Sequence, residues 1–102
     1  MPKIYEYFGL IFLIYVNEHE PIHVHVQNGK KESVIEIIRN SAGRVLEIRK
    51  RKASTGRELT SSKLNVAMKF VNVKAEEIIE AWSLIKKGKF NQKPIVITRK
   101  IV

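Results

Sequence analysis

The stretch PIHVHVQNGKKESVIEII (residues 21–38) predicts a β-hairpin, and the rest of the sheet extends from it. Pro21 suits the first position of a strand, and the Asn28-Gly29 pair tolerates the positive φ angles of a tight turn. If Asn28 pairs with Lys31, the register of the two strands is fixed. A slip of one residue would mix apolar with polar side chains, so we expect burial to maintain this register.

This register gives the hairpin one apolar face and one polar face. The apolar face is predicted to hold three cross-strand pairs, Val26 with Ser33, Val24 with Ile35 and Ile22 with Ile37. On the polar face, His23 is predicted opposite Glu36, and Gln27 opposite Glu32. We therefore expect the apolar face to form the core side of the sheet.

NSAG (residues 40–43) predicts a second turn and, after it, a third strand. Pairing Arg39 with Arg44 predicts two contacts across these strands, Leu46 opposite Ile37 and Glu47 beside Glu36. Three apolar residues are predicted to share the polar face, namely Val34, Ile38 and Val45. Their presence predicts that a loop, a partner chain or a second copy of the chain covers this face.

All three histidines lie in NEHEPIHVH (residues 17–25). In a strand, His23 and His25 point to the same face, while His19 precedes the strand in a loop. Together with Glu36 they are candidate catalytic residues, with His23 and His25 as general base and acid. His23, His25 and Glu36 are also candidate ligands of a divalent metal, the one cofactor that the sequence indicates. The alternative is that these are half-exposed strand histidines that only hydrogen-bond to their neighbours.

Residues 4–16 are rich in β-branched and aromatic side chains and predict one strand, with a bulge or bend at Gly9. Apolar residues at helical spacing predict two helices within residues 60–88, and Trp82 is expected to anchor the second in the core. Residues 94–98 predict an edge strand or an arm. The expected fold is α+β, an antiparallel sheet of four to five strands with two C-terminal helices packed on the face of Val24, Ile35 and Leu46.

The 102 residues fit one domain, with residues 1–59 mainly β, residues 60–88 helical and residues 89–102 a C-terminal strand or arm. The absence of cysteine excludes disulfides and thiolate metal sites and is consistent with a reducing cytoplasm. The apolar run within residues 8–16 is too short to span a bilayer. Neither a signal peptide nor a membrane anchor is therefore expected.

Positive charge is concentrated in the second part of the chain. Residues 1–43 hold four Lys/Arg and five Glu, whereas residues 44–102 hold fifteen and five, within a net charge of +9. Such an excess indicates an anionic partner, either nucleic acid or an acidic protein. The candidate phosphate contacts are Arg49, Lys50, Arg51, Lys52 and Arg57. The alternative is a solvated, charged strand edge that prevents aggregation.

Two motifs resemble a known family. Asn-Glu-His-x-Pro-x-His-x-His begins at Asn17, and Glu-x-x-Glu-Ala-Trp-x-Leu-x-Lys-x-Gly-Lys begins at Glu77. Both are similar to those of the short bacterial proteins grouped as domain of unknown function 4160, and the similarity covers most of the chain. The resemblance implies no settled activity, but many members look like one half of a toxin–antitoxin-type gene pair. This chain has Glu18 and Ile22 where the family often has Asp and a second Pro.

Two classes of function follow. The first, which we favour, is a component of a toxin–antitoxin-type pair that binds a small acidic partner protein or nucleic acid. The second is a histidine-dependent, ribonuclease-like enzyme or a metal-binding protein that uses His19, His23 and His25. The sequence alone does not decide whether the protein is an enzyme.

Overall fold

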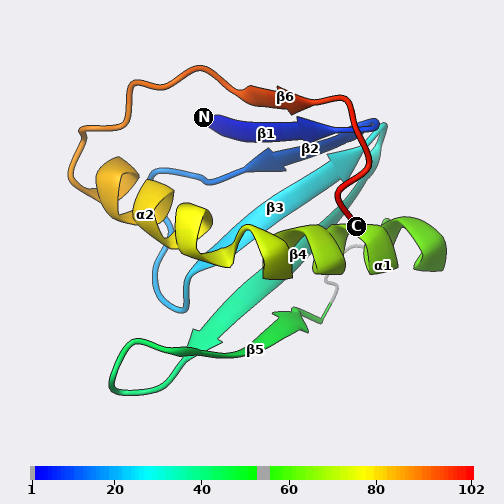
Figure 1. Cartoon of the computed structure of the whole chain (residues 1–102). Coiled ribbons are helices and arrows are strands. Elements are labelled where there is room, and N and C mark those ends of the chain that lie inside the picture. The colour runs from blue at the N-terminus through cyan, green and yellow to red at the C-terminus, as the bar shows by residue number, and fades with distance from the viewer. Residues whose placement is uncertain (1, 53–55) are drawn as a thin grey trace.

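The computed structural model describes residues 2–52 and 56–102 and has an α+β fold (Figure 1). Its six-stranded mixed sheet has the order β5-β4-β3-β2-β1-β6, and two helices run end to end across one face. The elements are β1 (Lys3–Tyr7), β2 (Leu10–Leu13), β3 (His23–Asn28), β4 (Lys31–Arg39), β5 (Val45–Lys50), α1 (Ser61–Val73), α2 (Ala75–Lys86) and β6 (Ile95–Ile97). The predicted α+β class and the two helices are confirmed, and the predicted antiparallel sheet of four to five strands is close but not exact, since the sheet has six strands and is mixed.

The extra strand in the first part of the chain comes from a tight turn that was predicted as a bulge. β1 and β2 form an antiparallel hairpin in which Tyr7 pairs with Leu10. The two residues between them, Phe8 and Gly9, have φ angles of +46° and +83°. A two-residue turn of this kind needs positive φ at both positions, and phenylalanine is an unusual residue there. The turn signal was therefore weak.

The last strand makes the sheet mixed. β6 lies at the sheet edge, as predicted, but pairs in parallel with β1, Tyr5 opposite Ile95. A parallel neighbour requires a crossover connection, and the two helices supply it, since the chain returns over the sheet before it reaches β6 (Figure 1).

The predicted register of the central hairpin is confirmed from the His23–Glu36 pair to the turn, and the N–H of Ile37 donates to the carbonyl of Ile22 just beyond it. His23 pairs with Glu36, Val24 with Ile35, Val26 with Ser33, Gln27 with Glu32 and Asn28 with Lys31. Val24, Val26 and Ile35 are fully buried in the core, as the apolar face of the hairpin requires. The turn at residues 29–30 therefore sets the position of both strand histidines.

The predicted register between β4 and β5 was wrong. Asn40 accepts the backbone N–H groups of Ala42 and Arg44 through its side-chain oxygen, and a bulge between Ile38 and Arg39 shifts the pairing. Ile37 consequently pairs with Ile48 instead of Leu46, and Glu36 pairs with Arg49 instead of lying beside Glu47. Leu46 is 65% exposed, and Val45 packs against the core cluster.

The helices close the core from one side. Thr60 caps α1 by accepting the N–H of Lys63, and α2 carries two glutamates in its first turn, where they complement the helix dipole. Phe70 of α1 stacks on Phe12 of β2 at 4.5 Å between ring centroids. Trp82 of α2 is 5% exposed, so its predicted place in the core is confirmed. No helix within residues 2–52 and 56–102 is long and apolar enough to cross a membrane.

Candidate metal centre

Three side chains from β3 and the loop before it converge. Glu18 lies in the loop between β2 and β3, and His23 and His25 lie on β3. One nitrogen or oxygen atom from each of the three residues lies within 4.8 Å of the others. The strand alternation that places both imidazoles on one face thus brings them to a carboxylate that folds over from the loop.

His25 is held at both ring nitrogens by carboxylates. Its Nδ1 lies 3.0 Å from Glu32 Oε2, and its Nε2 lies 2.8 Å from Glu18 Oε1. The ring stacks on Tyr15 at 3.9 Å between centroids, and Gln27 donates to Glu32 at 2.8 Å. The Glu32 carboxylate is therefore fixed from two sides and orients the imidazole.

His23 is oriented at one nitrogen only. Its Nδ1 lies 2.8 Å from the carbonyl oxygen of Pro21, and because a carbonyl only accepts, Nδ1 carries the proton and donates. Its Nε2 lies 3.5 Å from Glu18 Oε2 and makes no hydrogen bond. The residue is 1% exposed, and its ring contacts Trp82 at 5.1 Å between centroids. Within the described chain it is the one buried side-chain nitrogen or oxygen without a hydrogen-bond partner.

The loop that carries Glu18 is tied to the end of α2. The ammonium group of Lys86 donates to the carbonyl oxygens of Val16 and Glu18, and it lies 4.6 Å from the centre of the Trp82 ring. Lysine side chains near a helix end commonly make such contacts. The end of α2 thus positions both the Glu18 backbone and the indole that covers His23.

The electrostatics keep the carboxylates of the cluster charged. Burial alone raises the pKa of Glu18, but its hydrogen bond with His25 and its other interactions with the two histidines outweigh this and hold the pKa below its ordinary value. For Glu32, hydrogen bonds from Gln27 and His25 likewise outweigh burial and lower the pKa. Burial, together with the charge of Glu32, raises the pKa of the Tyr15 hydroxyl. Around neutral pH the cluster therefore presents two anionic carboxylates.

The predicted site residues separate into two groups. His23 and His25 come together, but the expectation that they are half-exposed was wrong, since they are 1% and 7% exposed. His19 is exposed and lies outside the cluster of ligand atoms. Glu36 faces His23 across the strands, yet its carboxylate pairs with Arg49 and Arg51. Glu18 therefore takes the place in the cluster that the sequence had assigned to Glu36.

The basic residues proposed to contact phosphate are also divided. Arg49 and Arg51 contact Glu36 at 3.0 and 2.9 Å, whereas Lys50 points to the other face and contacts Glu58 at 2.6 Å. Lys52 is exposed. Arg57 is exposed too, and its carbonyl oxygen accepts the N–H of Glu32. Strand alternation directs Arg49 and Lys50 of β5 to opposite faces, so the five residues do not share one face.

Sequence reasoning missed Glu18, Glu32 and Tyr15 as members of the site. A signal for Glu32 was present, because the predicted register places it diagonally across from His25. Glu18 and Tyr15 lie in the loop between β2 and β3, where the side-chain direction depends on tertiary contacts. The sequence predicted Tyr15 as part of a strand, and no periodicity covers Glu18.

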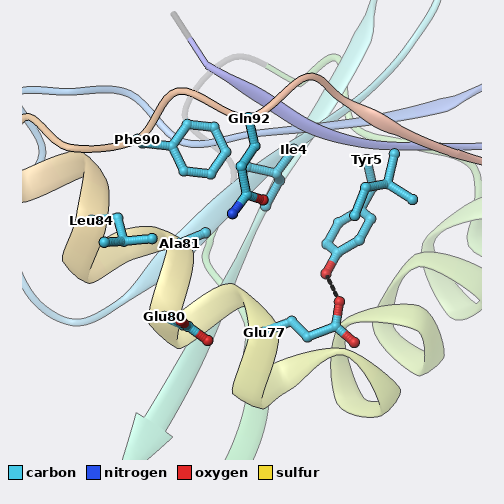
Figure 2. Close-up of a pocket in the computed structure, with 9 residues that line it drawn as sticks. Ile4, Tyr5, Glu77, Glu80, Ala81, Leu84, Phe90 and Gln92 are labelled. Atoms are coloured by element: carbon cyan, nitrogen blue, oxygen red, sulfur yellow. Dashed lines mark hydrogen bonds between the residues drawn. The ribbon is translucent and has the colours of Figure 1, made fainter.

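A pocket of about 210 Å³ lies away from the histidines, between α2, β1 and the chain leading to β6. Figure 2 shows the Tyr5 hydroxyl pointing at Glu77 at one end of it and Phe90 above Leu84 at the other. Tyr5 donates to Glu77 at 2.6 Å, and Lys74 donates to the same carboxylate at 3.3 Å. These polar groups satisfy one another, unlike those around His23.

Comparison with known proteins gives one match. The model of the family described as Domain of unknown function (DUF4160) matches residues 9–83. No curated protein and no solved structure matches the chain. The matched segment contains Glu18, His23 and His25, and it ends before Lys86, the lysine that ties the loop to α2.

Proposed function

Since the chain belongs to the domain of unknown function 4160 family, for which no activity is described, we propose its function from its site: Glu18, His23 and His25 bind a divalent transition-metal ion. The protein is in this proposal a metal-binding protein. The proposal changes the ligand set expected from the sequence, in which Glu36 stood in the place of Glu18.

The observation that carries the proposal is the unpartnered Nε2 of His23. Leaving a buried polar atom without a partner costs about 1–3 kcal/mol. The proton on Nδ1 is committed to Pro21, so Nε2 offers a lone pair directed toward Glu18, where His25 Nε2 also points. A metal ion bound between these atoms satisfies the buried nitrogen.

The distances suit such an ion. Two metal–ligand bonds of about 2.1 Å at ordinary coordination angles place the ligand atoms roughly 3.0–3.4 Å apart. The separations of Glu18 from His25 and His23 are 2.8 and 3.5 Å. The ligand atoms of all three residues lie within 4.8 Å of one another, so the most widely separated pair has to draw closer for one ion to be coordinated by all three.

The surrounding contacts match those of metal-ligating histidines. Such histidines commonly donate their second ring N–H to a carboxylate or a backbone carbonyl, which fixes the tautomer and the ring orientation. His25 has Glu32 in this role, and His23 has the carbonyl of Pro21. Both imidazoles are thus prepared to coordinate through Nε2.

The donor set indicates the metal and the type of site. Two imidazoles and one carboxylate bind zinc in hydrolytic sites and iron(II) in oxygen-dependent ones. Three protein ligands leave at least one coordination position for water or another ligand, which is typical of reactive sites and not of closed structural ones. Direct proton transfer by His23 to a nucleic acid receives less support, because that residue is 1% exposed.

Isothermal titration of the metal-free protein with zinc tests the proposal. We expect one equivalent to bind, and His25→Ala to weaken binding by at least about a hundredfold. His23→Phe keeps an aromatic ring beside Trp82 and should have the same effect without opening a cavity. His19→Ala is the matched control and should bind like the wild type. Wild-type protein that does not bind zinc, or a His25→Ala variant that binds it equally well, would refute the proposal.

We also propose an acidic protein partner, as in a toxin–antitoxin-type pair. The support is the net charge of +9 and the exposed lysines outside β5, which include Lys63, Lys69, Lys87, Lys89 and Lys93. Charges of one sign steer association with an oppositely charged surface. The test measures binding of the product of the adjacent gene and of a random RNA at several salt concentrations. Salt-sensitive binding of the RNA alone would favour nucleic acid instead.

A further inference from the structure

We propose that Arg49 and Arg51 bind the terminal phosphate group of a ligand that is also coordinated by the metal ion at Glu18, His23 and His25. The inference rests on the proposed metal site and names the class of ligand that this site takes. The structure brings the two arginines to the same face of the sheet as the histidines, two strands away.

The strand register places the arginines. His23 on β3 pairs with Glu36 on β4, and Glu36 pairs with Arg49 on β5, so the three side chains share one face. Neighbouring strands lie about 4.8 Å apart, so the backbone of Arg49 is roughly 10 Å from that of His23. Arginine is long enough to cover much of this gap, and a phosphate coordinated to the metal reaches toward it.

Glu36 holds the two guanidinium groups in place without using all of their donors. Arg49 donates to Glu36 Oε1 through Nε at 3.2 Å and Nη2 at 3.0 Å, and Arg51 donates to Oε2 through Nε at 2.9 Å. Each guanidinium has five N–H donors, so donors are left on both. The arginine side chains are 53% and 37% exposed, whereas that of Glu36 is 10% exposed. A ligand from solvent therefore has access to the arginines.

The charge of this cluster favours an anion. Burial raises the pKa of Glu36, but hydrogen bonds from Arg51 and Arg49 outweigh it and keep the carboxylate ionised. Two guanidinium groups and one carboxylate carry one net positive charge. β5 itself carries one carboxylate, Glu47. This residue is exposed and pairs with Ile38, two residues after Glu36 on β4.

The chemistry of both groups points to phosphate. A guanidinium group binds phosphate oxygens through parallel hydrogen bonds, and a three-ligand metal site has a free position for another oxygen. A terminal phosphate offers three oxygens and two negative charges near neutral pH, enough for both contacts. A phosphodiester offers fewer free oxygens and one charge, so a terminal phosphate is the better match.

The test is a titration of the zinc-loaded protein with inorganic phosphate and, separately, with a dinucleoside monophosphate as a diester. We expect inorganic phosphate to bind more tightly than the diester. Arg49→Gln and Arg51→Gln retain a hydrogen-bond donor for Glu36 and should each weaken phosphate binding at least about tenfold while zinc binding stays unchanged. Lys50→Gln removes a charge from the same strand on its other face and is the matched control, expected to bind like the wild type. Melting curves identify any variant that does not fold, in which case the other single variant serves.

The outcomes separate this inference from the metal site. Protein that does not bind zinc refutes the proposed function and this inference with it. Protein that binds zinc but binds phosphate no better than the diester, or equally well without the arginines, refutes the inference alone. Equal losses in Lys50→Gln and Arg49→Gln would show that net charge, and not the arginine pair, governs binding.

Discussion

Two polar clusters share one face of the sheet, and they differ in how completely their charges are satisfied. In the Glu36 cluster, both carboxylate oxygens accept hydrogen bonds from arginines, 3.0 Å from Arg49 Nη2 and 2.9 Å from Arg51 Nε. In the Glu18 cluster, His23 Nε2 is buried and has no hydrogen bond. The first cluster connects β4 with β5, whereas the second contains a buried nitrogen without a partner. This difference is the reason why we propose the Glu18 cluster as the metal centre, although the sequence favoured Glu36.

The largest change in the free energy of unfolding is expected when the carboxylate of the Glu36 cluster is removed. Glu36→Ala leaves Arg49 and Arg51 without their counter-ion on a partly buried surface, so we expect a loss of about 2 kcal/mol in the free energy of unfolding. Glu18→Ala should cost less than about 1 kcal/mol, because its side chain is 30% exposed. Urea unfolding of the metal-free variants measures both.

Zinc binding should show the opposite order. Glu18→Ala should lower zinc affinity about a hundredfold, whereas Glu36→Ala should leave it unchanged. If the loss of Glu36 weakens zinc binding as strongly as the loss of Glu18, the distinction between the clusters is wrong. The ligand set expected from the sequence would then be restored.

A smaller loss of zinc affinity is expected when Glu32, the carboxylate that contacts His25 Nδ1, is changed. Glu32→Gln removes the negative charge beside His25 Nδ1 and leaves one acceptor oxygen for the donors of His25 and Gln27, so it should lower zinc affinity about tenfold, with one equivalent still bound. Glu47→Gln, an exposed glutamate on β5, is the control for the loss of one negative charge. Titration calorimetry of both variants checks this, and equal affinities for Glu32→Gln and wild type would mean that Glu32 does not support the site.

The smallest effect concerns acid stability. The pKa of Glu36 is lowered in the folded protein, because its hydrogen bonds with the arginines outweigh burial, so its ionised form stabilises the fold above the ordinary glutamate value of 4.5. This contribution is lost as the pH falls through the lowered folded pKa. Glu36→Gln should therefore reduce the acid-dependent loss of stability below about pH 4.5, as measured by urea unfolding across pH. An unchanged slope would show that the Glu36 ion pairs contribute nothing.

Local signals predicted the central hairpin and both helices. The Asn28-Gly29 turn and the apolar alternation predicted the β3–β4 register, and apolar residues at helical spacing predicted α1. The β4–β5 register was not predictable from the apolar pattern. It depends on the Asn40 side chain and on a bulge, which leave the consecutive residues Leu46 and Glu47 both exposed.

The site was predictable in part for the same reason. His23 and His25 share a face because alternation requires it, whereas Glu18 reaches them through a loop whose path no periodicity sets. That path depends on contacts with Lys86, which is far away in sequence and lies at the end of α2. The burial of His23 likewise depends on Trp82 of the same helix. Long-range contacts of this kind are not encoded in the spacing of the motif.

The ¹⁵N NMR spectrum of the histidine rings during titration with zinc observes each proposed imidazole ligand separately. We predict that Nε2 of His23 and of His25 shifts with one equivalent of zinc, that both Nδ1 protons remain, and that the resonances of His19 do not change. A shift of the His19 resonances with no change at His23 would contradict the proposed metal site. A spectrum in which no histidine resonance shifts would contradict it equally.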